Sequence, residues 1–147
     1  MVHSTRWAVA LVLALLPSTI ILHAQDVAFR LVVHASNPVA SLTRDQVSKI
    51  FLRKVTQWDG HKPVLPVDQA PDSPVRRTFT KQIHQRTIAA IQTWWQQQTF
   101  AGIAVAPPER TSDAAVLAYI RMYPNAIGYV RAGVPTGKDV KIVDVTP

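Results

Sequence analysis

The alternation of apolar and polar residues along the chain predicts four short strands. Residues 28–34 (AFRLVVH) are rich in valine, leucine and phenylalanine, a composition typical of a strand. Residues 63–68 (PVLPVD) predict a strand at a sheet edge, because their two prolines have no N–H to donate to a neighbouring strand. Residues 126–131 and 140–145 predict two further strands.

Four helices are predicted between these strands, each with a polar residue at its start. Thr43 and Gln46 fit a capping box, in which each side chain bonds the backbone N–H of the other residue. Ser73 caps a second helix and is followed by proline at the first helical position. Thr87 begins a third helix that runs to about residue 98, and Ser112 begins a fourth. The apolar residues expected in the core are Val47, Ile50, Phe51, Val75, Phe79, Ile83, Ile88, Ile91, Trp95, Val116, Tyr119, Ile120 and Tyr123.

Strands interleaved with helices predict an α/β fold, a mixed sheet with helices on both faces. The chain has 147 residues, of which 48% are hydrophobic and 17% are charged, so one globular domain is expected. It contains no cysteine. Disulfide frameworks, cysteine-ligated metal sites and thiolate nucleophiles are therefore excluded.

The first 24 residues are predicted to be a secretory signal peptide rather than part of that domain. Arg6 precedes an unbroken apolar run at residues 8–16, followed by a polar segment with a small residue, Ala24, at its end. The apolar run is about half of the roughly 20 residues that a membrane-spanning helix needs. We expect cleavage after Ala24, although Leu22 is a poor residue at the third position before the cut and leaves an uncleaved anchor as the alternative.

Residues 25–147 form the predicted exported, periplasmic domain, which is strongly basic. The whole chain carries 16 Lys+Arg against 9 Asp+Glu, a formal charge of +7. Such a charge favours phosphate, anionic lipid headgroups or acidic proteins as partners. Nucleic acid is not expected as a partner, because export separates the protein from the genome. No stable membrane span is expected after cleavage.

No motif for catalysis or metal binding is present in the predicted domain. Its histidines are widely separated, so they form no metal-binding pair on a helix. Residues 133–139 (GVPTGKD) have one residue too few between the glycines for a phosphate-binding P-loop, and aspartate follows the lysine where Ser or Thr is required. Asp68 and Asp72 are interpreted as turn and capping residues. We therefore expect that the protein is not an enzyme and that it binds no metal ion or cofactor.

Ser73 marks the one position where the residues suggest a ligand. Helix starts present unpaired N–H groups and a partial positive charge, which suit an anion. Arg76 and Arg77 follow in the first turn, where exposed cations oppose the helix dipole at a cost of about 0.3–1 kcal/mol each. An anion held by Ser73, Arg76 and Arg77 would explain this placement, and two solvated arginines are the alternative. Arg77, Lys81 and His84 are expected to form a solvated basic face.

The tryptophan pair Trp94 and Trp95 allows two interpretations. Trp95 shares a helical face with Ile88 and Ile91, which predicts packing in the core. A stacking platform for sugars or bases is the alternative. Trp58 is expected to cover the core from a turn.

Four ordered segments resemble short, single-lobe relatives of the phosphate-binding proteins of bacterial ABC importers, within the type II periplasmic binding protein superfamily. They are residues 42–58, with a capped helix, an Ile-Phe pair and a turn tryptophan; residues 67–79; residues 94–108; and residues 126–130 (AIGYV). The resemblance covers about residues 32–130. It implies one lobe of that fold and a role in binding a solute for uptake rather than in catalysis.

The departures from that family concern the ligand. Full-length members have two lobes that close on the anion, and the glycine-and-serine loop that follows their first strand is missing from this chain. Their second anion loop, an arginine followed by Ser-Gly-Thr, corresponds to a region where Ser73 is kept, Pro74 replaces the glycine and Asp68 stands in place of the arginine. Arg53 and Asn125 each replace a usual glycine.

Two functional hypotheses follow from the sequence. One is an exported solute-binding-protein-like domain that binds phosphate or another small oxyanion weakly, in connection with ABC-type uptake, with a second copy or a partner supplying the missing lobe. The other is an envelope interaction module that has the same lobe, binds no ligand and uses its basic helix face.

Overall fold

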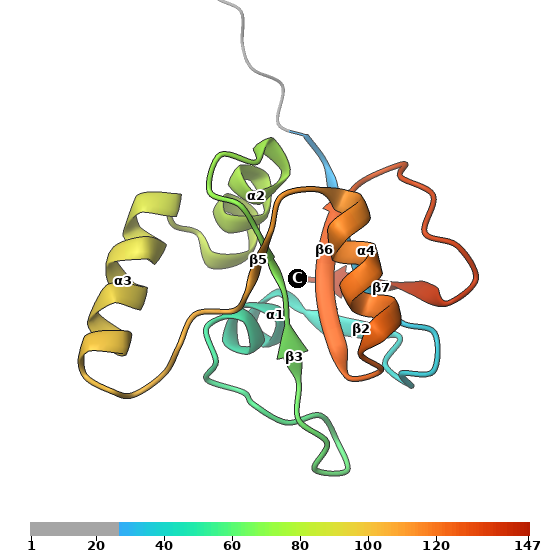
Figure 1. Ribbon diagram of the computed structural model, residues 1–147, viewed down its shortest axis with the longest axis horizontal. Helices are drawn as coiled ribbons and strands as arrows, with labels where there is room; N and C mark the ends of the chain where they lie inside the picture. Colours follow the sequence, from blue (N-terminus) through green and yellow to red (C-terminus); the bar gives the residue numbers. More distant parts are fainter. Residues whose placement is uncertain (1–26) are drawn as a thin grey trace, which may run out of the picture.

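The computed structural model of the protein describes residues 27–147, so the predicted signal peptide and its cleavage after Ala24 lie outside the described residues. The order of the elements is shown in Figure 1. They are β1 (Phe29–His34), β2 (Ser41–Thr43), α1 (Arg44–Phe51), β3 (Leu65–Pro66), β4 (Asp68–Gln69), α2 (Pro74–Phe79), the π-helical turn η1 (Thr80–His84), α3 (Ile88–Phe100), β5 (Glu109–Arg110), α4 (Asp113–Met122), β6 (Ala126–Arg131) and β7 (Val140–Thr146).

Five of the strands form one mixed sheet in the order β2-β7-β1-β6-β3. β1 is antiparallel to both of its neighbours, β6 and β7, whereas β2–β7 and β3–β6 are parallel pairs. β3 lies at the sheet edge, as the prolines predicted. β4 and β5 form a separate parallel pair beside the sheet. The predicted mixed α/β architecture is therefore confirmed.

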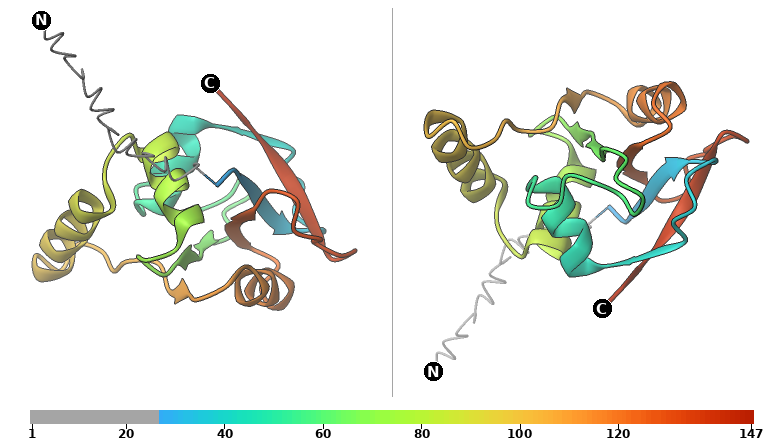
Figure 2. Two further views of the ribbon diagram at one scale, coloured as in Figure 1. Left: turned by 90° about the horizontal axis from the view of Figure 1, so that it is seen from above. Right: turned by 90° about the horizontal axis from the view of Figure 1, so that it is seen from below.

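Alternate residues of the central strands face opposite layers of helices. Leu31 and Val33 of β1 and Tyr129 of β6 pack in a cluster with side chains of α1 and α2. Val32 and Val130 belong to a second cluster, which α4 covers. Figure 2 shows α1 and α2 on one side of β1 and β6, and α4 on the other. The sheet is thus the middle layer of three.

Gly128 allows α4 to lie directly against β6. A Cβ at this position would lie 2.8 Å from Cγ1 of Val67 and 2.9 Å from Cγ1 of Val116, closer than packed carbon atoms approach one another. The absence of a side chain therefore sets the spacing between the helix and the sheet. This gives a structural reason for the glycine in the AIGYV segment.

The helix starts lie where the caps predicted them. The capping box is complete, since the Thr43 side chain accepts from the N–H of Gln46 at 3.2 Å and the Gln46 side chain accepts from the N–H of Thr43 at 2.8 Å. Thr87 and Ser112 cap α3 and α4 in the same way. α3 ends two residues later than expected, and Ile88 is only half-buried.

α3 lies to one side of the sheet layers (Figure 1). It is held by a small cluster in which Ile91 and Trp95 pack with Leu52, and Trp95 is 7% exposed. The prediction that Trp95 packs in a core is confirmed. Trp58 is half-buried against the main cluster. No helix within residues 27–147 is both long enough and apolar enough to span a bilayer.

His84 corrects the expectation of a solvated basic face, because its ring is half-buried. Nδ1 of His84 lies 2.9 Å from the hydroxyl oxygen of Ser48, and the ring meets the Phe79 ring edge-on at 5.6 Å between centroids. Burial, followed by the positive charges of Arg86 and Arg76, lowers the pKa of His84 to about 4. The imidazole is therefore neutral at pH 7.

We expect His84 to make the fold sensitive to acid. An unfolded chain takes up a proton at this residue below about pH 6.5, whereas the folded chain does so only below about pH 4. Stability is therefore lost as the pH falls between these values, by on the order of 2 kcal/mol. Urea unfolding at pH 7 and pH 4.5 should show a smaller loss for His84→Gln than for wild type, and no such rescue for His61→Asn, which changes an exposed histidine. An identical loss in all three proteins would contradict this prediction.

Candidate functional site

Ser73, the first predicted site residue, caps α2 and is engaged within the protein. Its hydroxyl oxygen accepts a hydrogen bond from the backbone N–H of Arg76 at 3.3 Å. The same hydroxyl donates to Oε1 of Gln69 at 2.7 Å. The Ser73 side chain therefore fixes the start of α2 against β4.

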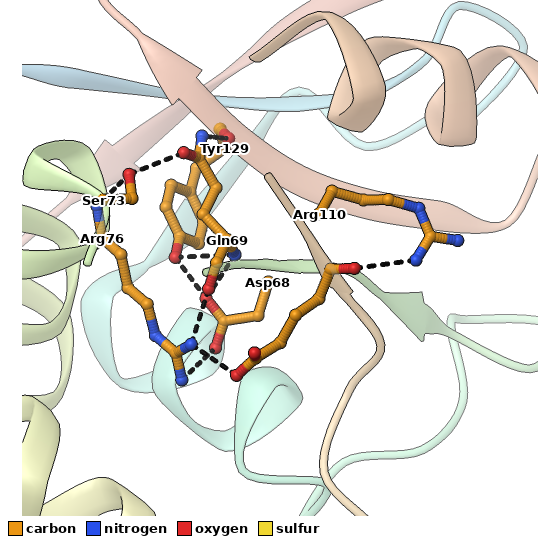
Figure 3. A network of polar contacts seen from close by, with 7 residues as sticks. Asp68, Gln69, Ser73, Arg76, Arg110 and Tyr129 are labelled. Atoms are coloured by element: carbon orange, nitrogen blue, oxygen red, sulfur yellow. Dashed lines mark hydrogen bonds and ion pairs between the residues drawn. The ribbon is translucent and has the colours of Figure 1, made fainter. Parts of the chain in front are cut away.

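The Arg76 side chain turns inward and is paired with two carboxylates (Figure 3). Nη1 donates to Oε1 of Glu109 and to the backbone carbonyl of Gln69, both at 2.5 Å. Nη2 lies 3.2 Å from Oδ2 of Asp68. Arg76 is only 3% exposed, so a buried charge is balanced internally.

Arg77, the third predicted residue, is exposed. Neighbouring positions on a helix differ by about 100° in direction. The structure therefore brings Ser73 and Arg76 to the same polar network and leaves Arg77 outside it. Arg76 is also not the solvated arginine of the alternative interpretation, because acidic residues distant in sequence cover it.

Asp68 corrects a second expectation, because it is neither a turn residue nor a cap. It lies in β4, is 8% exposed, and accepts hydrogen bonds from the Tyr129 hydroxyl and from the N–H of Gln69. Burial raises the pKa of Asp68, and the Arg76 guanidinium opposes this shift. Burial and the adjacent Asp68 carboxylate hold the pKa of Tyr129 well above its ordinary value, so the phenol stays neutral and donates.

Gln69 joins this ion pair to the start of a second helix. Its side-chain Nε2 donates to Oδ1 of Asp113, in the first turn of α4, at 2.9 Å and to the backbone carbonyl of Tyr129 at 3.1 Å. Asp113 Oδ1 also accepts from the N–H of Arg131 at 3.1 Å. A carboxylate of the chain itself thus occupies the favourable position at the start of α4. Within residues 27–147, every buried side-chain nitrogen and oxygen has a hydrogen-bond partner.

An open groove of about 570 Å³ runs between α3 and the β4–β5 pair, beside the Arg76 network. The side chain of Glu109 is 44% exposed, whereas that of Asp68 is 12% exposed. Glu109 is therefore the partner of Arg76 that can leave for water at the lower cost. The groove is lined by Asp68, Arg76, Gln92, Trp95, Gln96, Thr99, Phe100, Ala106, Pro107 and Glu109.

Sequence reasoning missed the roles of Glu109, Gln69 and Tyr129. The signal that could have indicated them is an acid at the end of an apolar strand, since Asp68 follows Val67 and must find partners if it is buried. No cluster of three or more His, Asp or Glu side chains suited to a metal ion occurs in the part of the chain that the structure describes. The groove is thus lined by one cation, Arg76, whose charge is balanced by two carboxylates, and by the aromatic side chains of Trp95 and Phe100.

The sequence matches the family described as a PBP superfamily domain over residues 24–145. This range includes all of the elements described above except the last residue of β7, Thr146. A comparison with curated proteins found no match.

Solved structures share the fold at low sequence identity. A protein from Clostridium perfringens, assigned as a phosphate ABC transporter substrate-binding protein and solved with bound phosphate, matches with a TM-score of 0.63 at 21% identity over 80% of this chain and 44% of its own. An ABC-type phosphate transport receptor from Vibrio cholerae matches with a TM-score of 0.62 at 19% identity, over 80% of this chain and 45% of its own. A protein from Planctomyces limnophilus, assigned as phosphate-binding, matches with a TM-score of 0.61 at 16% identity, over 80% of this chain and 41% of its own. The chain thus spans less than half the length of these structures.

Proposed function

The chain belongs to the periplasmic-binding-protein (PBP) superfamily, and on this premise we propose that it is a solute-binding domain that takes phosphate or another small oxyanion at the Arg76 end of the groove. Of the residues predicted for the anion, Arg76 is assigned the contact and Ser73 a positioning role. Arg77 is an exposed neighbour that adds positive charge nearby. An exported, periplasmic setting and a link to ABC-type uptake belong to the same proposal.

The pairing of Arg76 with Glu109 carries this proposal. The guanidinium lies on the groove, and one of its two acidic partners is half-exposed. An incoming oxyanion can replace the Glu109 carboxylate at Nη1, because both groups offer negatively charged oxygen atoms that accept hydrogen bonds from the same guanidinium. Binding is then an exchange of one anion for another, and no buried charge is left unpaired.

Asp68 predicts a preference for phosphate over sulfate. Phosphate at neutral pH retains at least one proton, so it can donate a hydrogen bond to a carboxylate beside Arg76. Sulfate carries no proton and would meet the Asp68 carboxylate as a like charge. Affinity should be weak in both cases, because in an open groove a charge pair at 4 Å contributes nearer about 1 kcal/mol than about 4.

The proposal is tested by titration calorimetry with phosphate and sulfate on residues 25–147, which include the hydrophobic clusters described above. Glu109→Gln removes the competing negative charge and should tighten phosphate binding by about tenfold. Arg77→Ala is the control for position, since it removes a positive charge from the exposed residue next to Arg76 and should change phosphate affinity far less. If Glu109→Gln leaves phosphate affinity unchanged, or if Arg77→Ala abolishes it, Arg76 is not the site.

One observation favours a second function, an interaction module without a small ligand. Both carboxylates beside Arg76 already satisfy its charge, and the hydroxyl of Ser73 is used by Gln69. Such a lobe would act through its surface on another envelope component. Absence of phosphate binding in wild type and in Glu109→Gln alike would favour this function.

A further inference from the structure

The most exposed apolar side chains of the described chain lie together at the end of α3. Phe100 is 97% exposed, Ile103 is 70% exposed and Val105 is 73% exposed. They fall within residues 87–108, which contain no Lys, Arg, Asp, Glu or His although the whole chain carries a formal charge of +7. We call the exposed side of α3 and of residues 101–107 the α3 face.

The α3 face is held in a defined shape. Gly102, at φ +68°, turns the chain after the helix, and the N–H of Ile103 donates to the carbonyl of Gln98 at 3.0 Å. Ala104 packs back onto the cluster that contains Trp95. The exposed side chains are therefore displayed on an ordered turn, which lowers the entropy lost when a partner binds.

The C-terminal end of the α3 face, where Phe100, Ile103 and Val105 are exposed, has the composition of the centre of a protein interface, whereas the other exposed positions of α3 are Gln, Thr and Ala. Such centres are depleted of charged residues and enriched in aromatic ones. Exposing this surface to water is unfavourable by on the order of 25 cal/mol for each Å² of apolar area. Phe100 alone offers on the order of 200 Å².

The charge of the rest of the chain indicates what covers this face. An acidic protein or an anionic lipid surface would be drawn to cationic side chains, and residues 87–108 supply none. The one cation recorded against α3 is Lys54, whose Nζ lies 6.0 Å from the centroid of the half-buried Trp94 ring. Two copies of this basic chain repel one another, and that repulsion is least when uncharged faces meet. We propose that two copies of the chain associate through their α3 faces about a twofold axis, so that the same apolar side chains meet from both sides.

This association would also cover the groove. Thr99 and Phe100 belong to the α3 face and line the groove beside Arg76. A second copy seated on Phe100 lies over the groove mouth and supplies a wall that one chain lacks. The proposal does not depend on oxyanion binding, because the mass of the assembly can be measured without any ligand.

The test is sedimentation equilibrium of residues 25–147 over a wide concentration range, with two substitutions on the face and one control. The wild type should approach twice the mass of one chain as concentration rises. Phe100→Asp and Ile103→Asp should each weaken the dimer by at least about tenfold, because each places two like charges in the interface. Met122→Asp, which alters a 68% exposed apolar residue on α4, should behave as wild type.

A spin label gives a second readout, since the chain has no cysteine of its own. A label attached through Thr99→Cys should show a short distance to the label of the second copy, and Phe100→Asp should abolish that signal. A monomer at all concentrations, or a dimer that survives both aspartate substitutions, overturns the proposal. A monomer that instead sediments with phosphatidylglycerol vesicles through Phe100 overturns it in favour of a lipid surface.

Discussion

Replacing Arg76 with alanine is expected to lower the free energy of unfolding by about 3–5 kcal/mol at pH 7, because it leaves buried Asp68 without its cation. The side chain is 4% exposed and bonds Asp68, Glu109 and the carbonyl of Gln69. Its removal also leaves the Gln69 carbonyl short of a donor. Urea unfolding of the wild type and Arg76→Ala, compared at the same pH, measures the difference.

Arg77→Ala is the matched control for this substitution. Arg77 is exposed, so its loss should change stability by no more than about 0.5 kcal/mol. Burial raises the pKa of Asp68, so an unpaired Asp68 is relieved by taking up a proton, and the penalty in Arg76→Ala should shrink at acid pH. Adding Asp68→Asn to Arg76→Ala should recover part of the loss. Equally small effects for Arg76→Ala and Arg77→Ala would mean that Arg76 is not paired as described.

Phe79→Ala is expected to lower the free energy of unfolding by a similar amount, about 3–5 kcal/mol, because it leaves a cavity at the centre of the main core cluster. The Phe79 ring is stacked on Tyr129 with 3.8 Å between centroids, and it lies 4.8 Å from the Phe51 ring. It is 1% exposed and joins α2 to β6 and α1. Thermal or urea unfolding would measure the loss.

The chain offers a control of the same residue type. Phe100 is 97% exposed, so Phe100→Ala should leave the stability of a single chain within about 0.5 kcal/mol of wild type. The comparison should be made at a concentration too low for two copies to associate. A large loss in Phe100→Ala under these conditions would place Phe100 in the core and contradict the described exposure.

Local signals were sufficient to predict most of the fold. A capping residue acts on N–H groups two or three positions away, so Thr43, Ser73, Thr87 and Ser112 indicated the four helix starts without knowledge of the tertiary structure. The apolar composition of residues 28–34 and 126–131 likewise predicted the two strands, β1 and β6, whose two faces are both covered by helices. The burial of Ile88 was overestimated, because helical periodicity indicates which face is apolar but not how much of that face is in contact. Only Ile91 and Trp95 of this face are buried in the cluster that holds α3.

The candidate site depended on contacts that sequence patterns do not report. Arg76 is buried because Asp68 in β4 and Glu109 in β5 both reach it, and β4 and β5 pair in parallel across a long segment of chain. The helix start alone suggested an arginine facing solvent. His84 was misjudged for the same reason, since Ser48 of α1 covers its ring.

The departures from the family pattern divide into two kinds. Arg53 adopts a φ of 56°, the left-handed conformation for which glycine is usual, so its backbone keeps the turn at some cost in strain. Asn125 has no positive φ, so no left-handed turn is needed there. Asp68 is different, because it replaces an expected cation with a buried acid whose partner is Arg76.

The central claim is that Arg76 exchanges the Glu109 carboxylate for an oxyanion. Nitrogen NMR of the arginine side chains during a phosphate titration tests it most directly, because the signals of Arg76 and Arg77 are followed separately. We predict that the Arg76 guanidinium signal shifts in a saturable way, at lower phosphate in Glu109→Gln than in wild type, while the Arg77 signal stays in place. An Arg76 signal that does not move at millimolar phosphate in either protein, or a shift confined to Arg77, would contradict the account.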